Sequence, residues 1–201
     1  AVDAAIAVQM VLTLVEPQSS GIGGGGFLLH YDPAIRKIES YDGRETAPAS
    51  AKSDMFLDAE GKPLEFYDAV VGGLSVGVPG TLRMLELAHR EHGKLPWAQL
   101  FAPAIKLAEE GFPVSARLSG EIAEDAYIPK MREAAHYFLD AQGHALPPGT
   151  VLKNPALADV LRAIATGGPD AFYKGKIAAD IVAAVTQAKP RAGGMPLAAL
   201  A

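Results

Sequence analysis

Residues 21–48 read GIGGGGFLLHYDPAIRKIESYDGRETAP, and the rest of the chain is best understood outward from this stretch. It opens with a glycine-dense turn, since five of the six residues 21–26 are glycine. The segment FLLHY at 27–31 predicts one short strand, and KIESYD at 37–42 predicts a second. Asp32-Pro33 joins the two segments, so we expect a β-hairpin. After it, Pro48 ends regular structure.

The glycine turn also satisfies the pattern G-x-G-x-x-G at Gly21, Gly23 and Gly26. A dinucleotide-binding loop must follow a strand and open a helix, whereas here a helical pattern precedes the glycines and a strand follows them. The Gly-Lys-Ser/Thr of a P-loop is missing as well. We therefore expect the turn to be structural, because glycine lets the backbone approach another group closely.

Arg44 stands directly after the second predicted strand, between Gly43 and Glu45. At the end of a strand, a guanidinium can present its planar fork to a carboxylate and make two charge-assisted hydrogen bonds. Two plainer interpretations remain open at this point. Arg44 could form an internal ion pair, or it could simply be a solvated strand end.

Four segments of the sequence together carry a family resemblance. They read EPQSSGIGGGGFLLHYD (16–32), DGRETAPA (42–49), GVPGT (77–81) and GPDAFYKG (168–175). In this order they resemble the large subunit of gamma-glutamyltranspeptidases. In that family the arginine of the RETAP-like motif binds the α-carboxylate of the γ-glutamyl donor. The resemblance therefore implies a substrate-binding role for Arg44.

The resemblance also implies a fold, an activity and partners. Gamma-glutamyltranspeptidases are N-terminal-nucleophile (Ntn) hydrolases, so this helix-rich α+β chain is expected to be part of an αββα sandwich, incomplete here. The family transfers the γ-glutamyl group of glutathione-like amides to water or to an acceptor amine, with no cofactor. The nucleophile is the N-terminal threonine of a small subunit released from the same precursor. That subunit and a small-molecule γ-glutamyl donor are the expected partners, and a periplasmic or extracellular location is suggested.

The chain begins at Ala1, which has no hydroxyl group to act as such a nucleophile. Its threonines are all internal: Thr13, Thr46, Thr81, Thr150, Thr166 and Thr186. None of them stands in a Thr-Thr-His-like processing motif. We therefore expect a fragment from the front and middle of a large subunit, with no catalytic residue in this chain and no activity of its own.

The composition is that of a globular protein, with 49% hydrophobic and 20% charged residues in a chain of 201. One domain over residues 1–201 is the expectation at this length. A net charge of −5 with scattered basic residues argues against nucleic-acid binding. The lack of cysteine excludes disulfides and thiolate chemistry. The apolar run 4–15 is too short to cross a bilayer, which takes about 20 residues.

Most of the remaining chain shows helical patterns. The segment 3–15 is apolar on nearly all faces, which predicts a helix buried on more than one side, and Glu16-Pro17 ends it. Further helices are expected at 80–92, 96–111 with a kink or restart at Pro103, 115–127, 129–139, 154–166 and 174–188. The glycine-rich run 69–78 is expected to be a core strand.

Other functions have weaker support from the sequence. Residues 73–77 match G-x-S-x-G, so a serine hydrolase using Ser75 is an alternative, although the β–α alternation of a parallel sheet is missing. A related Ntn acylase subunit of the glutaryl or cephalosporin type and a catalytically inactive scaffold are two more. His89 and His92 are spaced i, i+3 rather than as His-Glu-x-x-His, so no metal site is expected.

Overall fold

The computed structural model describes residues 1–200, and its contacts divide the chain into two compact units. The first unit combines Asp3–Gly21 with Leu95–Ala165, and Ala1 belongs to it. The second unit combines Ile22–Lys94 with the residues from Thr166 onward, and Val2 belongs to it. The expectation of a single domain over residues 1–201 stays a prediction.

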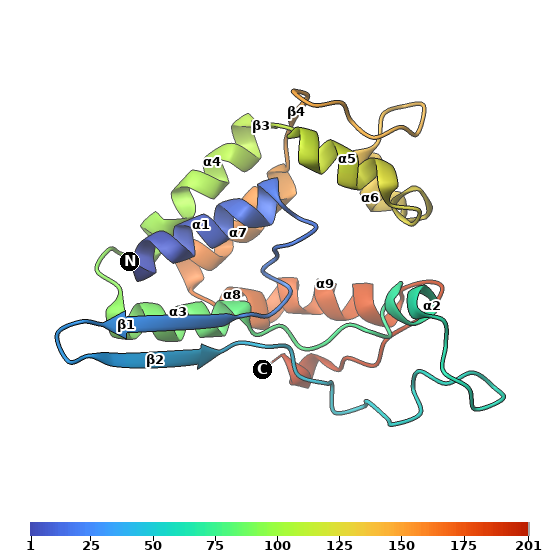
Figure 1. Cartoon of the computed structure of the whole chain (residues 1–201), viewed down its shortest axis with the longest axis horizontal. Helices are drawn as coiled ribbons and strands as arrows, with labels where there is room; N and C mark the ends of the chain where they lie inside the picture. Colours follow the sequence, from blue (N-terminus) through green and yellow to red (C-terminus); the bar gives the residue numbers. More distant parts are fainter. Residues whose placement is uncertain (201) are drawn as a thin grey trace. The chain divides into compact units, whose positions relative to one another are not determined.

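The first unit is mostly helical (Figure 1). Its elements are α1 (Val2–Val15), the 3-10 helix η1 (Trp97–Phe101), α4 (Ala102–Glu110), β3 (Phe112–Pro113), α5 (Ala116–Glu124), the 3-10 helix η2 (Ile128–Lys130), α6 (Arg132–Phe138), β4 (Val151–Leu152) and α7 (Pro155–Gly167). Strands β3 and β4 pair in antiparallel fashion. Helix α4 starts one residue before Pro103, which confirms the predicted restart, because proline is tolerated in the first turn of a helix.

The packed interior of the first unit lies around the β3–β4 pair. Its buried residues come from α1, α4, α5 and α7, from the two short strands and from the residue directly after β3: Leu14, Ala108, Phe112, Val114, Leu118, Ile122, Leu152 and Ala158. Ser115 caps α5, since its Oγ accepts a hydrogen bond from the backbone N–H of Leu118 at 3.0 Å. Because Ser115 is the capping residue, α5 begins at Ala116, one residue after the start of the predicted helix 115–127.

Helix α1 ends where the sequence predicts, directly before Glu16-Pro17. Its buried side chains follow one stripe at a spacing of four residues: Val2, Ile6, Met10 and Leu14. Val8, on another face, is 55% exposed. Within the described residues, then, only one stripe of α1 is fully buried, and the expected burial on more than one side is not found there. The reason is that the described residues pack against this helix along a single stripe.

The second unit holds a β-hairpin and the helices that follow it. Its elements are β1 (Phe27–Asp32), β2 (Lys37–Asp42), α2 (Phe66–Val70), α3 (Thr81–His92), α8 (Asp170–Tyr173), α9 (Gly175–Thr186) and the 3-10 helix η3 (Leu197–Ala199). Strands β1 and β2 pair in antiparallel register from Phe27 opposite Asp42 to Asp32 opposite Lys37. The predicted hairpin is therefore confirmed, with its turn after Asp32-Pro33.

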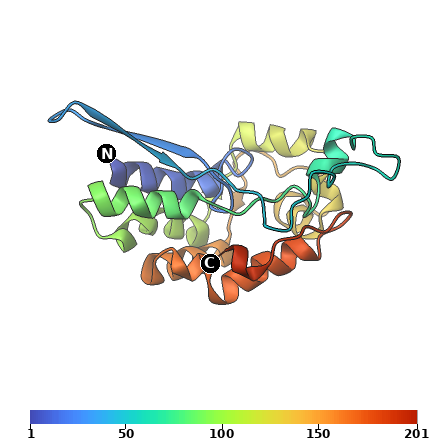
Figure 2. The same cartoon turned by 90° about the horizontal axis from the view of Figure 1, so that it is seen from below.

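The two faces of the hairpin differ in character. One face exposes large apolar side chains, those of Phe27, Leu29, Tyr31 and Ile38, each more than half exposed. The opposite face carries Tyr41, which is buried, and β2 contacts α3 on that side. Figures 1 and 2 show the tip of the hairpin extending beyond the end of α3. Alternation along the strands thus leaves an apolar face uncovered by the described residues.

The helix α2 extends to Val70, residues 71–75 form bends and turns, and Val78 makes only an isolated bridge, so the expected core strand at 69–78 is wrong. Long-range packing explains the difference. The backbone N–H of Gly73 donates to the carbonyl oxygen of Arg191 at 2.7 Å, and a Cβ on Gly73 would collide with the Val185 carbonyl. Backbone groups that a strand partner would use are therefore bonded to a segment more than one hundred residues away.

Among residues 1–200, no helix is both long enough and apolar enough to cross a bilayer.

Candidate functional site

The glycine turn is held against the start of α3 by backbone hydrogen bonds. Gly26 and Gly43 exchange N–H···O bonds of 3.2 and 2.9 Å, which extend the hairpin ladder by one pair. The carbonyl oxygen of Gly24 accepts bonds from the N–H groups of Gly80 and Thr81 at 3.1 and 3.2 Å. These are among the N–H groups that the first turn of α3 leaves without partners of its own, so the glycine turn serves as a cap for this helix.

Close approach of other atoms explains the glycines at positions 25 and 43. A Cβ on Gly25 would lie 2.5 Å from the Gly43 carbonyl oxygen and 2.6 Å from Glu45 Oε2. On Gly43 it would lie 2.6 Å from Met84 Cβ. Real Cβ atoms essentially never come this close to other heavy atoms. The expectation of a structural, close-packed turn is therefore supported at Gly25, whereas a Cβ on Gly23 or Gly26 would meet nothing within 4 Å.

The two later motifs join the same assembly. Thr46 and Val78 form an isolated antiparallel bridge, so the RETAP segment pairs with the GVPGT segment. The buried Tyr173, from GPDAFYKG, donates its hydroxyl hydrogen bond to the Pro79 carbonyl oxygen at 2.9 Å. Gly24–Gly26 of the first motif and the three later motifs thus contribute to one compact part of the second unit, around the chain that carries Arg44.

Charged groups also connect α3 with the start of α8. The Arg83 guanidinium lies 4.7 Å from the centre of the Tyr173 ring and forms an ion pair with Asp170. Hydrogen bonds from the Lys174 ammonium and the Arg83 guanidinium lower the pKa of the Asp170 carboxyl. Asp170 therefore remains an anion at neutral pH, and the link between α3 and α8 persists there.

Arg44 lies just after the end of β2. Its backbone N–H is hydrogen-bonded, and its side chain is accessible to solvent. Its N–H donates to Asp42 Oδ1 at 2.9 Å, while the side chain is 61% exposed. Nη1 lies 3.0 Å from Oε2 of the neighbouring Glu45, an atom that is buried and receives no hydrogen bond. The internal ion pair foreseen as one interpretation thus exists, but it leaves most of the guanidinium fork open to solvent.

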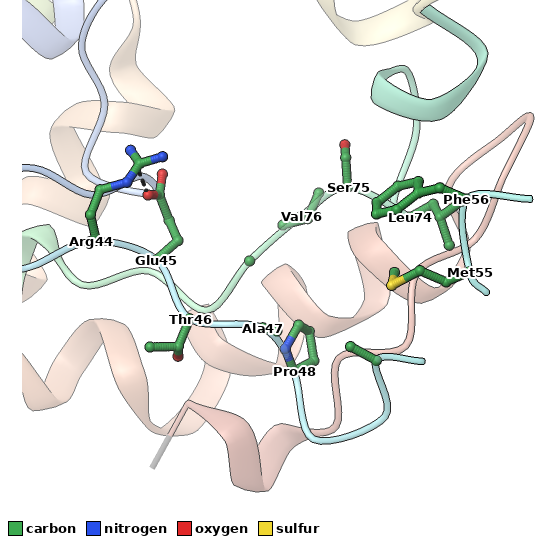
Figure 3. A pocket seen from close by; sticks show the side chains of 12 residues that line it. Arg44, Glu45, Thr46, Ala47, Pro48, Met55, Phe56, Leu74, Ser75 and Val76 are labelled. Atoms are coloured by element: carbon green, nitrogen blue, oxygen red, sulfur yellow. Dashed lines mark ion pairs between the residues drawn. The ribbon is translucent and has the colours of Figure 1, made fainter. Parts of the chain in front are cut away.

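A cavity of about 320 Å³ opens beside Arg44. Its lining comes from three parts of the second unit: Arg44, Glu45, Thr46, Ala47, Pro48, Ala51, Met55, Phe56, Leu74, Ser75, Val76 and Gly77. Figure 3 shows Arg44 and Glu45 on one side, with Met55, Phe56 and Leu74 on the opposite side. A charged fork facing an apolar wall suits a small ligand with one anionic end and an aliphatic body.

Sequence reasoning missed the apolar wall of this cavity. Met55 and Phe56 belong to the segment 50–66, which is mostly polar. Two adjacent large apolar residues in such a segment were the available signal, since they have to pack against something. Their partner Leu74 lies about twenty residues further on, and no periodic pattern links it to them.

Ser75 lines the same cavity, but its surroundings are not those of a hydrolase nucleophile. Its hydroxyl donates to the Val70 carbonyl oxygen at 2.7 Å. The short helix α2 and a bend precede it, where the motif requires a strand. The cavity lining includes no histidine within the described residues. The structure therefore gives the serine-hydrolase alternative no support.

A fluorophosphonate probe tests this point directly. We expect no labelling of Ser75 in the complete protein, because a serine without a neighbouring base is a weak nucleophile. The measurement is peptide mass spectrometry after labelling, with a Ser75→Ala variant as the control. Labelling that disappears in Ser75→Ala would restore the serine-hydrolase alternative.

Comparison with known proteins assigns this chain to a protein family. The family model described as gamma-glutamyltranspeptidase matches residues 1–198. The chain belongs to this family. The glutathione hydrolase proenzyme of Bacillus subtilis is 45% identical over 179 residues, which are 89% of this chain and 30% of that protein. The chain thus spans less than a third of the length of this curated relative.

Solved structures agree with the gamma-glutamyltranspeptidase assignment. The crystal structure of Helicobacter pylori gamma-glutamyltranspeptidase matches all of this chain with a TM-score of 0.91 and 32% identity, and 56% of that chain is covered. A cephalosporin acylase from Bacillus halodurans also matches all of it, with a TM-score of 0.78, 29% identity and 37% of that chain covered. The expected helix-rich α+β fold, part of an Ntn-hydrolase sandwich, is confirmed. The role of Arg44 is tested by neither comparison.

Proposed function

We propose that the complete protein transfers the γ-glutamyl group of glutathione-like amides to water or to an acceptor amine, and that Arg44 binds the donor's α-carboxylate. The observation that carries this proposal is the accessible Arg44 fork beside a cavity, in a chain of the gamma-glutamyltranspeptidase family. The Bacillus subtilis relative is named a glutathione hydrolase proenzyme, which favours the same substrate class.

The chemistry of the donor fits the cavity. A γ-glutamyl group has an α-carboxylate at one end and an aliphatic stem that leads to the scissile amide. The carboxylate accepts two parallel hydrogen bonds from a guanidinium, a geometry that lysine cannot reproduce. Glu45 holds one edge of Arg44 through the 3.0 Å ion pair, so the fork is oriented before the donor arrives.

The nucleophile and its subunit have to come from elsewhere in the complete protein. We propose that a small subunit of the same precursor supplies the N-terminal threonine. The β1–β2 hairpin supports this part of the proposal. Within the described residues its sheet has two strands, and one of its faces exposes apolar side chains. Such a hairpin is marginally stable alone and gains from further strands.

The first test is turnover by the complete gene product of two anilides that share a carboxylate. We expect cleavage of γ-glutamyl-p-nitroanilide, measured by release of p-nitroaniline, and much slower cleavage of glutaryl-p-nitroanilide, which lacks the α-ammonium group. The reverse preference would favour the acylase alternative, which the match to cephalosporin acylase keeps in view. Failure of a self-cleaved protein to hydrolyse either anilide would point to an inactive scaffold.

A further inference from the structure

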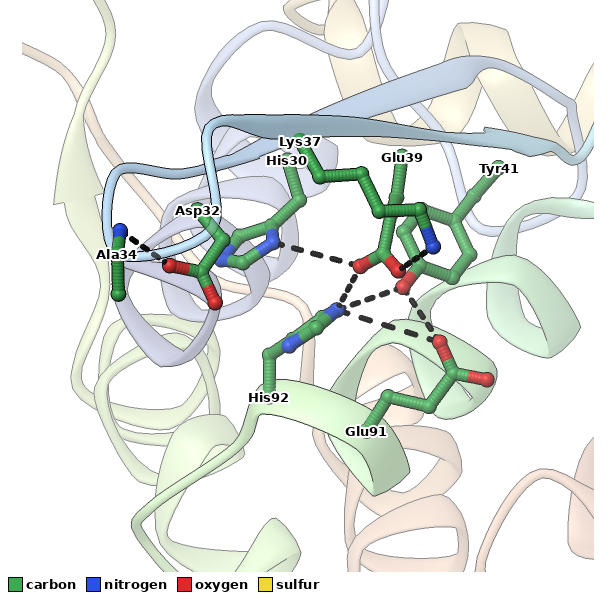
Figure 4. A network of polar contacts seen from close by, with 8 residues as sticks. All are labelled: His30, Asp32, Ala34, Lys37, Glu39, Tyr41, Glu91 and His92. Carbon is green, nitrogen blue, oxygen red and sulfur yellow. Dashed lines mark hydrogen bonds and ion pairs between the residues drawn. The ribbon is translucent and has the colours of Figure 1, made fainter.

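Three potential metal ligands meet on the inner face of the hairpin. His30 on β1 and Glu39 on β2 are direct cross-strand partners, so their side chains leave the sheet on the same side. His92, the last residue of α3, reaches the same place from below. Figure 4 shows the three side chains converging, together with Tyr41 and Glu91. One donor atom from each of the three residues lies within 4.8 Å of the other two.

One carboxylate oxygen is shared by both imidazoles. Glu39 Oε2 lies 2.7 Å from His92 Nε2 and 3.7 Å from His30 Nδ1. The two rings are stacked, with centroids 3.8 Å apart and an interplanar angle of 21°. Each of the three side chains is between 19% and 26% exposed, so the cluster is largely shielded from solvent.

The histidine on the strand has an unmet polar atom. His30 Nδ1 is buried and has no hydrogen-bond partner. Burying a nitrogen without a partner is unfavourable. A cation bound by His30, Glu39 and His92 would satisfy this nitrogen.

We propose that His30, Glu39 and His92 bind one divalent transition-metal ion of the Zn²⁺ type. In a tetrahedral zinc site with bonds of about 2.0–2.2 Å, neighbouring ligand atoms lie roughly 3.3 Å apart. The distances of 2.7 and 3.7 Å from Glu39 Oε2 lie on either side of that value. Binding requires the two stacked imidazoles to turn so that one nitrogen of each points at the ion. Two histidines, one carboxylate and one water form a recognised zinc coordination set.

Space for the water ligand is present on the solvent side. A cavity of about 390 Å³ is lined by both histidines and by the surrounding residues of the hairpin and of the end of α3: His30, Tyr31, Asp32, Pro33, Glu91, His92, Gly93 and Lys94. Because the cavity reaches the cluster directly, an ion can enter without unfolding the hairpin. Two nitrogen ligands favour zinc and its neighbours over Mg²⁺ or Ca²⁺, which prefer oxygen.

The other charged groups near the three ligands include one that opposes a bound cation and one that favours it. Lys37 Nζ binds Glu39 Oε1 at 2.9 Å; its positive charge opposes a cation but leaves Oε2 available. Glu91 adds a negative charge, with Oε2 4.0 Å from His92 Nε2. The Tyr41 hydroxyl donates to Glu91 at 2.5 Å and also lies 2.8 Å from His92 Nε2. Metal binding would replace this last contact and the 2.7 Å contact between His92 Nε2 and Glu39 Oε2.

The test uses the complete protein without a histidine tag, stripped with a chelator and titrated with ZnCl₂ in a calorimeter. We expect one Zn²⁺ per chain above any seen in the variants below, with release of protons and a higher thermal unfolding midpoint, since a bound ion stabilises the folded state. CoCl₂ in place of zinc should give the visible absorption of four-coordinate Co²⁺.

Three variants locate the ion. His30→Gln, Glu39→Gln and His92→Gln should each weaken binding by at least about tenfold and remove the cobalt absorption. His144→Gln is the matched control, because His144 is 79% exposed and also faces a carboxylate, that of Asp140. Circular dichroism shows which variants fold, and one folded variant suffices for the test. The proposal is overturned if no stoichiometric zinc binds, if a folded cluster variant binds as well as the unmodified protein, or if His144→Gln loses binding equally.

Discussion

Replacing Arg44 with alanine in the complete protein is expected to lower kcat/KM for γ-glutamyl-p-nitroanilide by roughly 100-fold or more. Hydrogen bonds to charged groups contribute about 1.5–3 kcal/mol each, and every 1.4 kcal/mol or so corresponds to a factor of ten. Most of the loss should appear as a higher KM, because the α-carboxylate is bound in the ground state and in the transition state alike. Arg44→Lys should fall between, since it keeps the charge and loses the fork.

Arg132→Ala is the matched control for this prediction. Arg132 is 93% exposed and lies 3.6 Å from the adjacent Glu133, so it repeats the sequence arrangement of Arg44 and Glu45 on a plain helix surface. We expect it to leave kcat and KM unchanged. Thermal unfolding of each variant separates a loss of substrate binding from a loss of folding. This measurement is needed because Arg44→Ala removes the ion-pair partner of Glu45 Oε2, which is buried.

A truncated donor shows whether the carboxylate is the group that Arg44 binds. The 4-aminobutyryl anilide keeps the aliphatic stem and lacks the α-carboxylate. It should be a poor substrate for the unmodified protein and equally poor for Arg44→Ala, because the contact is already absent. A similar loss in Arg44→Ala for both donors would show instead that Arg44 acts by shaping the cavity or stabilising the fold.

Local signals in the sequence predicted much of the fold. Glu16-Pro17 ends α1 and Asp32-Pro33 begins the hairpin turn, both as expected. These residues act through their own backbone preferences, so their effect does not depend on distant partners. The hairpin register then follows from alternation and turn position.

Long-range contacts are what the sequence could not reveal. Residues 69–78 looked like a strand because their apolar content is high, yet Gly73 is bonded to Arg191. Helical spacing relates His92 only to His89, because it indicates neighbours on one face of the same helix. Its actual neighbours, His30 and Glu39, lie on the hairpin more than fifty residues earlier. No pattern within α3 indicates which strand residues it will meet.

The candidate site lies between these cases. Arg44 was singled out from a local motif together with a family resemblance, and the structure places it beside a cavity. Opposite it, Leu74 comes from the irregular segment whose path depends on long-range contacts. A motif can therefore identify the charged group of a site, whereas the apolar wall that gives the site its size emerges only from the packed structure.

Gly25→Ala in the complete protein is expected to lower the free energy of unfolding by about 1–3 kcal/mol or more. The added Cβ would lie 2.5 Å from the Gly43 carbonyl oxygen and 2.7 Å from the Glu45 nitrogen, and both are backbone atoms that cannot rotate away. Relief requires the glycine turn to move away from Gly43, which would weaken the hydrogen-bonded pair that extends the hairpin. The measurement is the midpoint of thermal or denaturant unfolding.

Gly23→Ala provides the control within the same turn. A Cβ there meets nothing within 4 Å, and no left-handed backbone angle opposes it. It should leave stability unchanged or raise it slightly, by up to about 1 kcal/mol, because alanine restricts the unfolded chain. If Gly25→Ala accumulates too poorly for unfolding experiments, soluble yield relative to Gly23→Ala is the measure. Equal unfolding midpoints and equal soluble yields for the two variants would mean that the turn shifts at Gly25 at little cost in stability. The glycine density would then need an explanation other than close packing, such as freedom to move when the donor binds beside Glu45.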